Sequence, residues 1–423
     1  MFQTVRNAFK VPELRNKIFF TLMMIFLVRF GSNLAVIPGV RENALEQIAK
    51  SYSGINLISD FSKLSIFTLG IMPYITASIV MMLLQIAVPR IEKMIKEDVG
   101  GRKKYTKIIR YLTIVLASIQ AVGITFSTLR PAFIKNAPGT LDYLVVIAAM
   151  VAGTVILMWF GELITEKGLG NGISIIILIN IIARVPGGVQ ILWQQAKLSG
   201  RWMEVIGLIL VFVPIIGLVL LLQQGERRIA VQYAKVVSGR SVAGAHKTHI
   251  PFRVNLSGVM PIIFAMSLMQ FPLILGQLMG ADATQGWYKW VVMISGVVTS
   301  KPTLIGIVVY VFIIILFAYF FAQANTNVLE IADRMKKSAG FIPGVRPGAP
   351  TVEYLYKVLN SVVLLGALFL AGVALLPIAL TAITGINVNF GGTSLLIAVG
   401  VSLEMVKQLE AQMITRHYKG FLR

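Results

Sequence analysis

The sequence predicts an all-α polytopic membrane protein. Of its 423 residues, 56% are hydrophobic and only 13% are charged, whereas charged residues make up about a quarter of a typical soluble chain. A helix of about 20 apolar residues crosses a bilayer, and ten such segments follow one another along the chain. The predicted spans are residues 18–37, 73–88, 108–129, 142–160, 171–185, 203–222, 257–276, 303–321, 358–376 and 393–407.

Basic residues are divided unequally between the two sides of the predicted membrane. Of the 39 Lys and Arg residues, 28 lie on the side of the termini, 10 lie on the other side, and Arg29 lies within the first span. The acidic residues divide 12 to 6, so the net charges of the two sides are +16 and +4. The positive-inside rule therefore places both termini in the cytoplasm. This placement explains the net charge of +21 by membrane orientation rather than by nucleic-acid binding.

The N-terminal residues MFQTVRNAFKVPELRNK are basic and amphipathic. They lead into a full-length span rather than into a short apolar region with a small-residue cleavage site, so we expect no cleaved signal peptide. The chain contains no cysteine, which excludes disulfide bonds and thiolate chemistry.

The most informative stretch runs from residue 60 to residue 89. It is apolar enough to enter a bilayer, but Gly70 and Pro73 interrupt it. Because glycine weakens a helix and proline removes a backbone donor, we predict a short helix, a break, and a spanning helix from about Pro73 to Val88. A broken helix at membrane depth must be buried in protein or line a wet cavity, and such breaks often mark functional sites. The alternative is a helix that is only kinked.

Ten spans with both termini on one side suggest two five-helix halves. An odd number of spans in each half inverts the second half relative to the first, as in many conducting membrane folds. We therefore predict an N-terminal half at 1–185, an external hinge at 186–202 and a C-terminal half at 203–423. The two halves show no convincing similarity of sequence, so this prediction rests on topology.

Two cytoplasmic loops are too long to be simple connectors. Residues 223–255 alternate apolar and polar side chains around Ser238 and Gly239, which predicts a projecting hairpin. Residues 322–357 predict a short helix followed by a tip rich in glycine and proline that carries Arg346. Together the loops hold eleven Lys and Arg residues. Long ordered loops of this kind usually bind a partner.

Signatures of catalysis and of cofactor binding are absent from the sequence. It contains no G-x-x-x-x-G-K-[ST], H-E-x-x-H or G-x-S-x-G. Gly168, Gly170 and Gly172 follow no predicted strand, which favours a turn before the fifth span over a nucleotide loop. His246 and His249 have no carboxylate or thiol beside them, which favours solvated loop residues over a metal site. We predict no catalytic residues, no metal and no cofactor.

The spans contain few groups that could couple transport to ions. An ion-coupled transporter needs buried acids or a charged relay. The polar residues within or near the spans are Arg29, Gln85, Gln120, Asn180, Gln270, Gln323 and Glu404. A passive pathway powered by a partner is therefore favoured over a secondary transporter or a small-solute channel, and an intramembrane protease lacks a catalytic pair.

Four long motifs then resemble a known family. SIFTLGIMPYITASIVMMLL, EKGLGNGISIII, ANTNVLEIADRMKKSAGFIPGVRPG and FGGTSLLIAVG are similar, in this order, to segments of the SecY family of protein-translocation channels. The resemblance implies two five-helix halves around a central hourglass pore closed by a plug helix. It also implies lateral opening between spans two and seven, which releases membrane helices into lipid while secreted chains cross.

The resemblance assigns roles to specific residues. It implies a ring of apolar side chains that closes the pore, at Ile75, Ile79, Ile173, Ile177, Ile263 and Ile397. Isoleucine suits this role because it is bulky, stiff at χ1 and able to exclude ions by dewetting. The implied plug helix comprises Ser59, Asp60, Phe61, Ser62, Lys63, Leu64, Ser65, Ile66, Phe67, Thr68 and Leu69. Polar residues of the lateral gate would be Gln120 and Asn255, the latter at the start of span seven.

The resemblance also implies partners and a location. Arg240, Lys247 and Arg346 would bind the SecA ATPase or the ribosome, through its protein and its rRNA. An arginine at a loop tip offers a planar fork of donors to carboxylate or phosphate groups. The implied protein is a passive channel of the bacterial inner membrane, assembled with SecE and SecG. Its expected substrates are signal sequences and unfolded preproteins, and it would release hydrophobic segments into the lipid bilayer.

Overall fold

A computed structural model of the protein describes residues 9, 11–34, 37, 65–97, 100–129, 133, 139–200, 202–233, 237–238, 241–242, 247–278, 286–297, 303–384 and 392–420. Each of the ten predicted spans coincides with a helix. By length and hydropathy, five helices within the described residues can cross a membrane, and a bent pair of helices makes a sixth candidate. The number of ten spans remains a prediction.

The chain divides into two compact units. Unit 1 comprises Met1–Arg201, Met266–Val309 and Ile386–Arg423, and unit 2 comprises Trp202–Ala265 and Tyr310–Gly385. These units follow the proximity of residues in space rather than the two halves of the predicted repeat. The division into halves at 1–185 and 203–423 therefore stays a prediction.

Unit 1 is helical in its described part. Its complete elements are α2 (Pro12–Leu34), α4 (Met72–Ala87), α5 (Pro89–Glu97), α6 (Gly101–Ile124), the π-helix η2 (Thr125–Leu129), α7 (Thr140–Lys167), α8 (Gly172–Ser199), α11 (Gly286–Ile294), the 3-10 helix η4 (Ser295–Val297) and α15 (Gly392–Gly420). The later part of α10 (Met260–Leu278) and the first residues of α12 (Leu304–Asn325) also belong to it.

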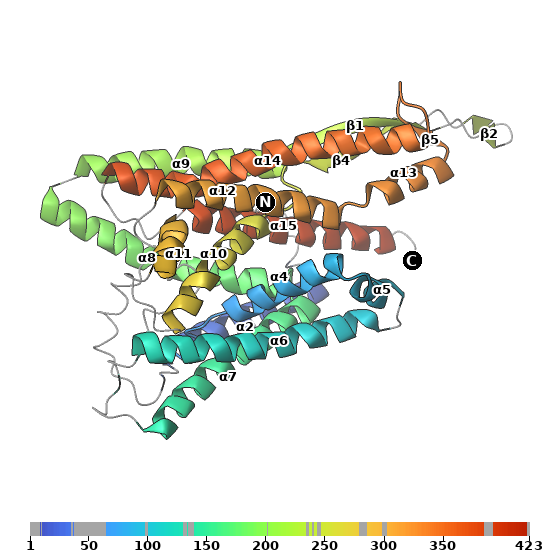
Figure 1. Cartoon of the computed structure of the whole chain (residues 1–423). Coiled ribbons are helices and arrows are strands. Elements are labelled where there is room, and N and C mark those ends of the chain that lie inside the picture. Colours follow the sequence, from blue (N-terminus) through green and yellow to red (C-terminus); the bar gives the residue numbers. More distant parts are fainter. Residues whose placement is uncertain are drawn as a thin grey trace. The chain divides into compact units, whose positions relative to one another are not determined.

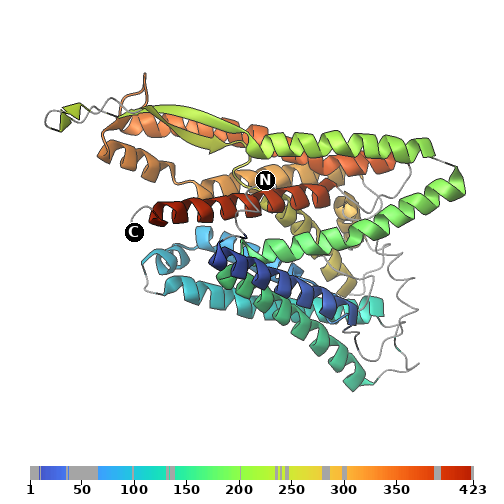
Figure 2. The same ribbon diagram turned by 180° about the vertical axis from the view of Figure 1, so that it is seen from behind.

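In unit 1, α7 packs on α2, α6 and α8. Figure 1 shows α4, α6 and α7 side by side, and Figure 2 shows α2 on the opposite side of α7. α8 packs on both α7 and α15. The core between α6 and α7 includes Ala121, Ile124, Val146 and Met150, all buried. This packing brings a stripe of small and apolar side chains on each helix out of water and lipid.

Unit 2 combines long helices with a small antiparallel sheet. Its complete elements are α9 (Trp202–Gln224), β1 (Glu226–Tyr233), β2 (Val237–Ser238), β3 (Ser241–Val242), β4 (Lys247–Arg253), α13 (Val328–Lys337), β5 (Gly340–Phe341) and α14 (Ala349–Thr384). The first residues of α10 and most of α12 complete the unit. In Figure 1, α9 and α14 run side by side, and the strands continue along the far end of α14.

The predicted hairpin in residues 223–255 is confirmed. β1 and β4 pair antiparallel, with Glu226 opposite Arg253 and Gln232 opposite Lys247. β2 and β3 pair next to the predicted turn. β5 adds a third strand on the other side of β1, which the sequence pattern did not predict because two residues are too few to show an alternation.

Candidate functional site

The predicted break before the second span lies where the sequence placed it. Gly70 has a φ of 59°, in the left-handed region that favours glycine. Pro73 lies in the first turn of α4, where its missing N–H costs nothing. The helix predicted from about Pro73 to Val88 is confirmed as Met72–Ala87, and it is followed by α5 at a bend of 104°.

The predicted plug helix differs from the structure in its described part. Residues 59–64 lie outside the described residues, Ser65 is a bridge residue, and residues 66–71 form consecutive turns instead of a helix. The Thr68 N–H donates to the Ser65 carbonyl at 3.0 Å, and the Gly70 N–H donates to the Phe67 carbonyl at 2.8 Å. Ser65 also accepts at its Oγ from the Phe67 N–H at 3.2 Å. Local side-chain bonds from serine and threonine favour such turns over a helix. We call residues 65–71 the plug segment.

The plug segment packs against α2 and α7 at two glycines. A Cβ on Gly31 of α2 would overlap the Phe67 ring, and a Cβ on Gly153 of α7 would overlap the Ile66 carbonyl. Leu69 is 2% exposed and belongs to the core between α6 and α7. The segment is therefore buried in unit 1 and lies too close to α2 and α7 for any side chain at these two glycines.

The six isoleucines of the predicted ring are buried or half-buried. Ile75 and Ile79 lie on α4, Ile173 and Ile177 on α8, and Ile397 on α15, all in unit 1. Ile263 lies on α10 in unit 2. Among them Ile173 is half-buried, and the others are at most 5% exposed. The direct packing of α8 on α15 brings two of the three ring helices of unit 1 together.

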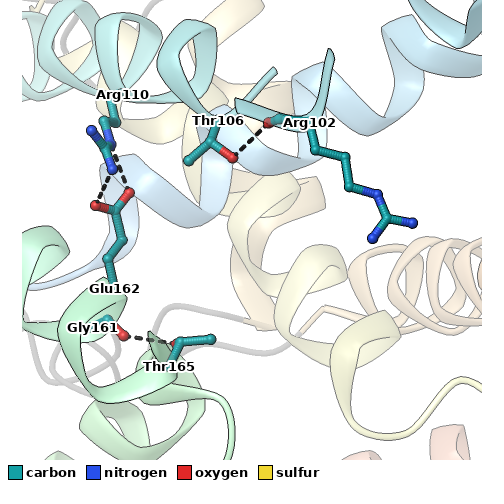
Figure 3. Close-up of polar contacts among 6 residues, drawn as sticks. All are labelled: Arg102, Thr106, Arg110, Gly161, Glu162 and Thr165. Carbon is teal, nitrogen blue, oxygen red and sulfur yellow. Dashed lines mark hydrogen bonds and ion pairs between the residues drawn. The ribbon is translucent and has the colours of Figure 1, made fainter. Parts of the chain in front are cut away.

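The start of α8 is held by side chains of three elements. Asn171 caps α8, accepting at Oδ1 from the Ile173 N–H at 3.1 Å. Thr165 of α7 accepts from the Gly172 N–H at 2.9 Å, and it donates to the Gly161 carbonyl at 2.8 Å. Figure 3 shows the bond from Thr165 to the Gly161 carbonyl. Thr21 of α2 accepts from the Leu169 N–H at 3.0 Å. We call residues 168–171 the α7–α8 joint.

The path of the chain from α7 to α8 requires glycine at two positions. A Cβ on Gly172 would overlap the Gly161 carbonyl. Gly170 has a φ of 75°, which turns the chain between the helices. The predicted turn before the fifth span is therefore confirmed.

An ion pair links α6 to α7 above this joint. Arg110 Nε donates to Glu162 Oε1 at 2.8 Å, and its Nη2 lies 2.7 Å from Glu162 Oε2, so the contact is bidentate (Figure 3). The Arg110 side chain is 50% exposed and that of Glu162 is 20% exposed. A bidentate arginine–carboxylate pair fixes geometry better than a single contact does.

The candidate binding loop of unit 2 is built on a hydrophobic core. Ile342 follows β5 and is buried with Val231 of β1, Met335 of α13 and Leu355 of α14. The chain then passes through Gly344 and Gly348, which have positive φ values of 85° and 108°. We call residues 343–348 the tip loop.

The tip loop exposes one arginine. Arg346 is exposed, and its backbone carbonyl accepts from Thr351 Oγ1 at 2.8 Å. Of the other predicted docking residues, Lys247 is the first residue of β4, and Arg240 lies outside the described residues. The tip loop therefore holds its backbone in place while the Arg346 guanidinium points away from the core.

The predicted gate residues lie on different units. Gln120 is buried on α6 of unit 1, and Asn255 is buried in unit 2. Asn255 was expected at the start of a span, but α10 begins at Met260, so it lies in the connection from β4 to α10. Within the described residues, Asn255 Oδ1 has no hydrogen-bond partner. Nearby, Ser257 Oγ donates to the Ala318 carbonyl of α12 at 3.1 Å, which fixes this connection.

Sequence reasoning missed several residues that shape the site. Gly31 and Gly153 lie within apolar helices, where a glycine is a signal for close packing but does not identify its partner. Thr21 and Thr165 also gave no signal, because threonine in a span usually bonds only to its own helix. Within the described residues, no group of three or more His, Asp and Glu side chains could hold a metal ion.

Comparisons with known proteins agree on one family. The sequence model of the SecY family matches residues 65–406. The chain is 42% identical to the protein translocase subunit SecY of Streptomyces scabiei over the full length of both chains. It is 38% identical to the protein of the same name from Thermotoga maritima, covering 100% of this chain and 98% of the relative.

Solved structures share the fold. A structure described as a protein conducting channel superimposes with a TM-score of 0.67 at 19% identity, covering 95% of this chain and 93% of the other. A structure of Sec61 in the canine ribosome-channel complex gives a TM-score of 0.65 at 18% identity, with the same coverage. Because the family model covers most of the sequence and relatives match it from end to end, this protein belongs to the SecY family.

Proposed function

We propose that this chain is a passive, gated protein-conducting channel. It moves unfolded secretory polypeptides across the membrane and releases hydrophobic segments sideways into lipid. The observation that carries this proposal is the end-to-end similarity, at 42% identity, to a relative named as a protein translocase subunit. The broken segment before α4 and the buried isoleucines of α4, α8 and α15 support it, because a channel needs a closable apolar constriction.

The proposed seal of the channel is the ring of six isoleucines, with the plug segment as a second barrier. Five of these isoleucines belong to unit 1, and Ile263 belongs to unit 2. The plug comprises Ser59–Leu69, of which Ser65–Leu69 supplies the buried, described part. A ring of bulky apolar side chains excludes ions and still binds no passing peptide strongly.

The proposed lateral gate uses Gln120 and Asn255. A polar contact between membrane helices contributes about 0.6 kcal/mol on average, which suits a contact that must break in each cycle. The lack of a partner for Asn255 Oδ1 among the described residues is consistent with a group that pairs in one state of the gate. A buried amide oxygen left unpaired is costly, so it favours a change of state that satisfies it.

The proposed partners follow from the cytoplasmic loops. Arg346, with Arg240 and Lys247, would bind SecA or the ribosome, which supply the energy that a passive channel lacks. A structural neighbour is Sec61 in a ribosome-channel complex, which supports the ribosome as one of these partners. SecE and SecG would complete a heterotrimer in the bacterial inner membrane, with both termini of this chain in the cytoplasm.

The test of the proposed function is translocation by purified components. The chain is reconstituted with SecE- and SecG-like subunits, and SecA-driven entry of an unfolded preprotein into vesicles is measured by protection from protease. The variant Ile79→Gly with Ile263→Gly should leak ions through the resting channel, because it removes two side chains of the ring. Absence of preprotein entry in the unmodified complex would overturn the proposed function, and unchanged ion conductance in the variant would overturn the ring.

A further inference from the structure

The short helix α11 carries two exposed tryptophans beside the ends of two other helices. Trp287 is 47% exposed and Trp290 is 61% exposed. With nine residues, α11 is far shorter than the roughly 20 residues that a membrane-spanning helix needs. The chain enters α11 after α10 ends at Leu278, and it begins the apolar span α12 at Leu304. The helix therefore lies in the connection between α10 and α12.

Both neighbouring helices fix the position of α11. A Cβ on Gly276 of α10 would overlap the ring of Tyr288, which is 7% exposed. A Cβ on Gly306, in the first turn of α12, would lie 2.6 Å from the Ile294 carbonyl. Thr303 Oγ1 donates to the Met293 carbonyl. These contacts hold the helix in one rotation about its axis, so the direction of its exposed side chains is determined.

The exposed side of α11 is an apolar stripe. Residues three and four apart lie on the same face of a helix, so the exposed Trp287 and Trp290 and the half-buried Val291 and Ile294 form one face about 100° wide. Lys289 lies on the opposite side of the helix and is exposed. A short helix with aromatic side chains on one face and a cation on the other is typical of a segment lying in a membrane interface.

We propose that α11 lies in the lipid headgroup interface, with Trp287 and Trp290 inserted at the boundary between headgroups and acyl chains. Tryptophan is enriched at this depth because its ring is largely apolar while its indole N–H can donate to phosphate or ester oxygens. Lys289, on the far side, would face water and lipid phosphates. The start of α12 favours lipid as the occupant, because Leu304 and Val308 are 78% and 59% exposed and continue the apolar surface along the chain.

The position of α11 has a structural consequence for α10. Because Tyr288 packs on Gly276, insertion of α11 into the interface restrains the end of α10 at the membrane surface. This surface lies at the opposite end of α10 from β4, which precedes that helix in the chain. The restraint does not depend on what the channel carries, so it can be tested without any translocation assay.

The test measures the depth of the two tryptophans by fluorescence quenching. The chain has five tryptophans. The variant Trp159→Phe, Trp193→Phe, Trp202→Phe retains only the two of α11. The matched control replaces all five tryptophans with Phe and carries Phe312→Trp, at a position that is 63% exposed and lies at the middle of the predicted span 303–321. Both proteins, as full chains in their complex, are reconstituted into phosphatidylcholine vesicles brominated at either a shallow or a deep acyl position.

The expected result is a difference in depth between the two proteins. Shallow bromines should quench the α11 pair about twofold more than deep bromines, because interfacial helices insert only about 5–10 Å. For the control with Phe312→Trp the deep bromines should quench at least as strongly as the shallow ones. Aqueous iodide should quench the α11 pair only weakly.

Three results would overturn the proposal. Strong iodide quenching without bromine quenching would place α11 in water. Equal or stronger quenching by deep bromines would place the tryptophans in the hydrocarbon core. Protection from both quenchers would mean that another protein, either a partner subunit or a second copy of this chain, covers the stripe.

Discussion

The plug segment and the α7–α8 joint both lie against α2 and α7, but they are held by different interactions. The plug segment contacts these helices through packing, with Phe67 on Gly31 and the Ile66 carbonyl on Gly153. The bonds donated by the N–H groups of Phe67, Thr68 and Gly70 end within the segment itself. The α7–α8 joint instead donates to Thr21 of α2, and the first N–H of α8 donates to Thr165 of α7.

This difference suggests which of the two connections can move. The three bonds donated by Phe67, Thr68 and Gly70 would stay intact if the plug segment moved away from α2 and α7, so its displacement would leave none of these N–H groups unpaired. Removing the joint from α2 and α7 would leave two N–H groups unpaired, and each buried unpaired group costs about 1–3 kcal/mol. The comparison fits the proposed roles, since the plug must be displaced when a polypeptide passes while α8 must keep Ile173 and Ile177 in place.

The largest effect is expected from a methyl group added where the plug segment packs on α7. Gly153→Ala places a methyl group where the Ile66 carbonyl lies. Overpacking of this kind costs about 1–3 kcal/mol, and displacement of the plug segment should raise the ion leak of the resting channel. The leak is measured as iodide flux into vesicles, together with the midpoint of thermal unfolding. The control is Gly187→Ala, where a Cβ would meet nothing within 4 Å. Equal leaks for the two variants would show that the plug segment does not contribute to the seal.

A somewhat smaller effect is expected from the joint. Thr165→Val removes the acceptor of the Gly172 N–H and should lower the free energy of unfolding by about 1–2 kcal/mol. Thr165→Ser keeps the hydroxyl and should recover most of this loss. The control is Thr106→Val on α6, because Thr106 is half-buried and bonds to the Arg102 carbonyl of its own helix (Figure 3). Equal midpoints of thermal unfolding for the two valine variants would show that the bond from the Gly172 N–H to Thr165 stabilises the protein no more than a bond within one helix does.

The ion pair between Arg110 of α6 and Glu162 of α7 should contribute less to the free energy of unfolding than the plug contact or the α7–α8 joint does. Glu162→Gln breaks a bidentate pair whose arginine is half exposed, and pairs of this exposure contribute about 0.2–1 kcal/mol. A double-mutant cycle with Arg110→Gln isolates the coupling energy from thermal unfolding midpoints. The coupling should weaken as salt is raised. A coupling above about 2 kcal/mol would contradict the view that this ion pair is a minor support.

The smallest effect on stability is expected at the tip loop. Arg346→Glu changes an exposed side chain whose backbone is fixed independently by the bond from Thr351. The unfolding midpoint should hardly change, since exposed charges contribute about 1 kcal/mol or less. SecA- or ribosome-dependent transport should nevertheless fall strongly. The control is Lys336→Glu, an exposed charge on α13 outside the tip loop. Normal transport by the Arg346 variant would contradict the docking role.

Much of the local structure of this protein was predictable from its sequence. Apolar runs marked the helices, because only a helix satisfies every backbone group within lipid. Gly70 and Pro73 marked the break before α4 to within two residues. The alternation of side chains in residues 226–233 and 247–253 marked the hairpin. The resemblance to one family, carried by four motifs, was confirmed by the family match over residues 65–406.

What the sequence could not predict depended on contacts between distant residues. It predicted a helix through Leu69, but side-chain bonds from Ser65 and packing on α2 and α7 produce turns there. It placed Asn255 at the start of a span, but α10 begins only at Met260, and Ser257 in the connection before it bonds to α12. Gly31, Gly153, Thr21 and Thr165 were ordinary residues of apolar helices in the sequence. Composition and periodicity determine which segments enter the membrane, whereas only the tertiary structure decides which glycine admits a neighbour and which hydroxyl meets a backbone N–H, because both depend on where a second helix passes.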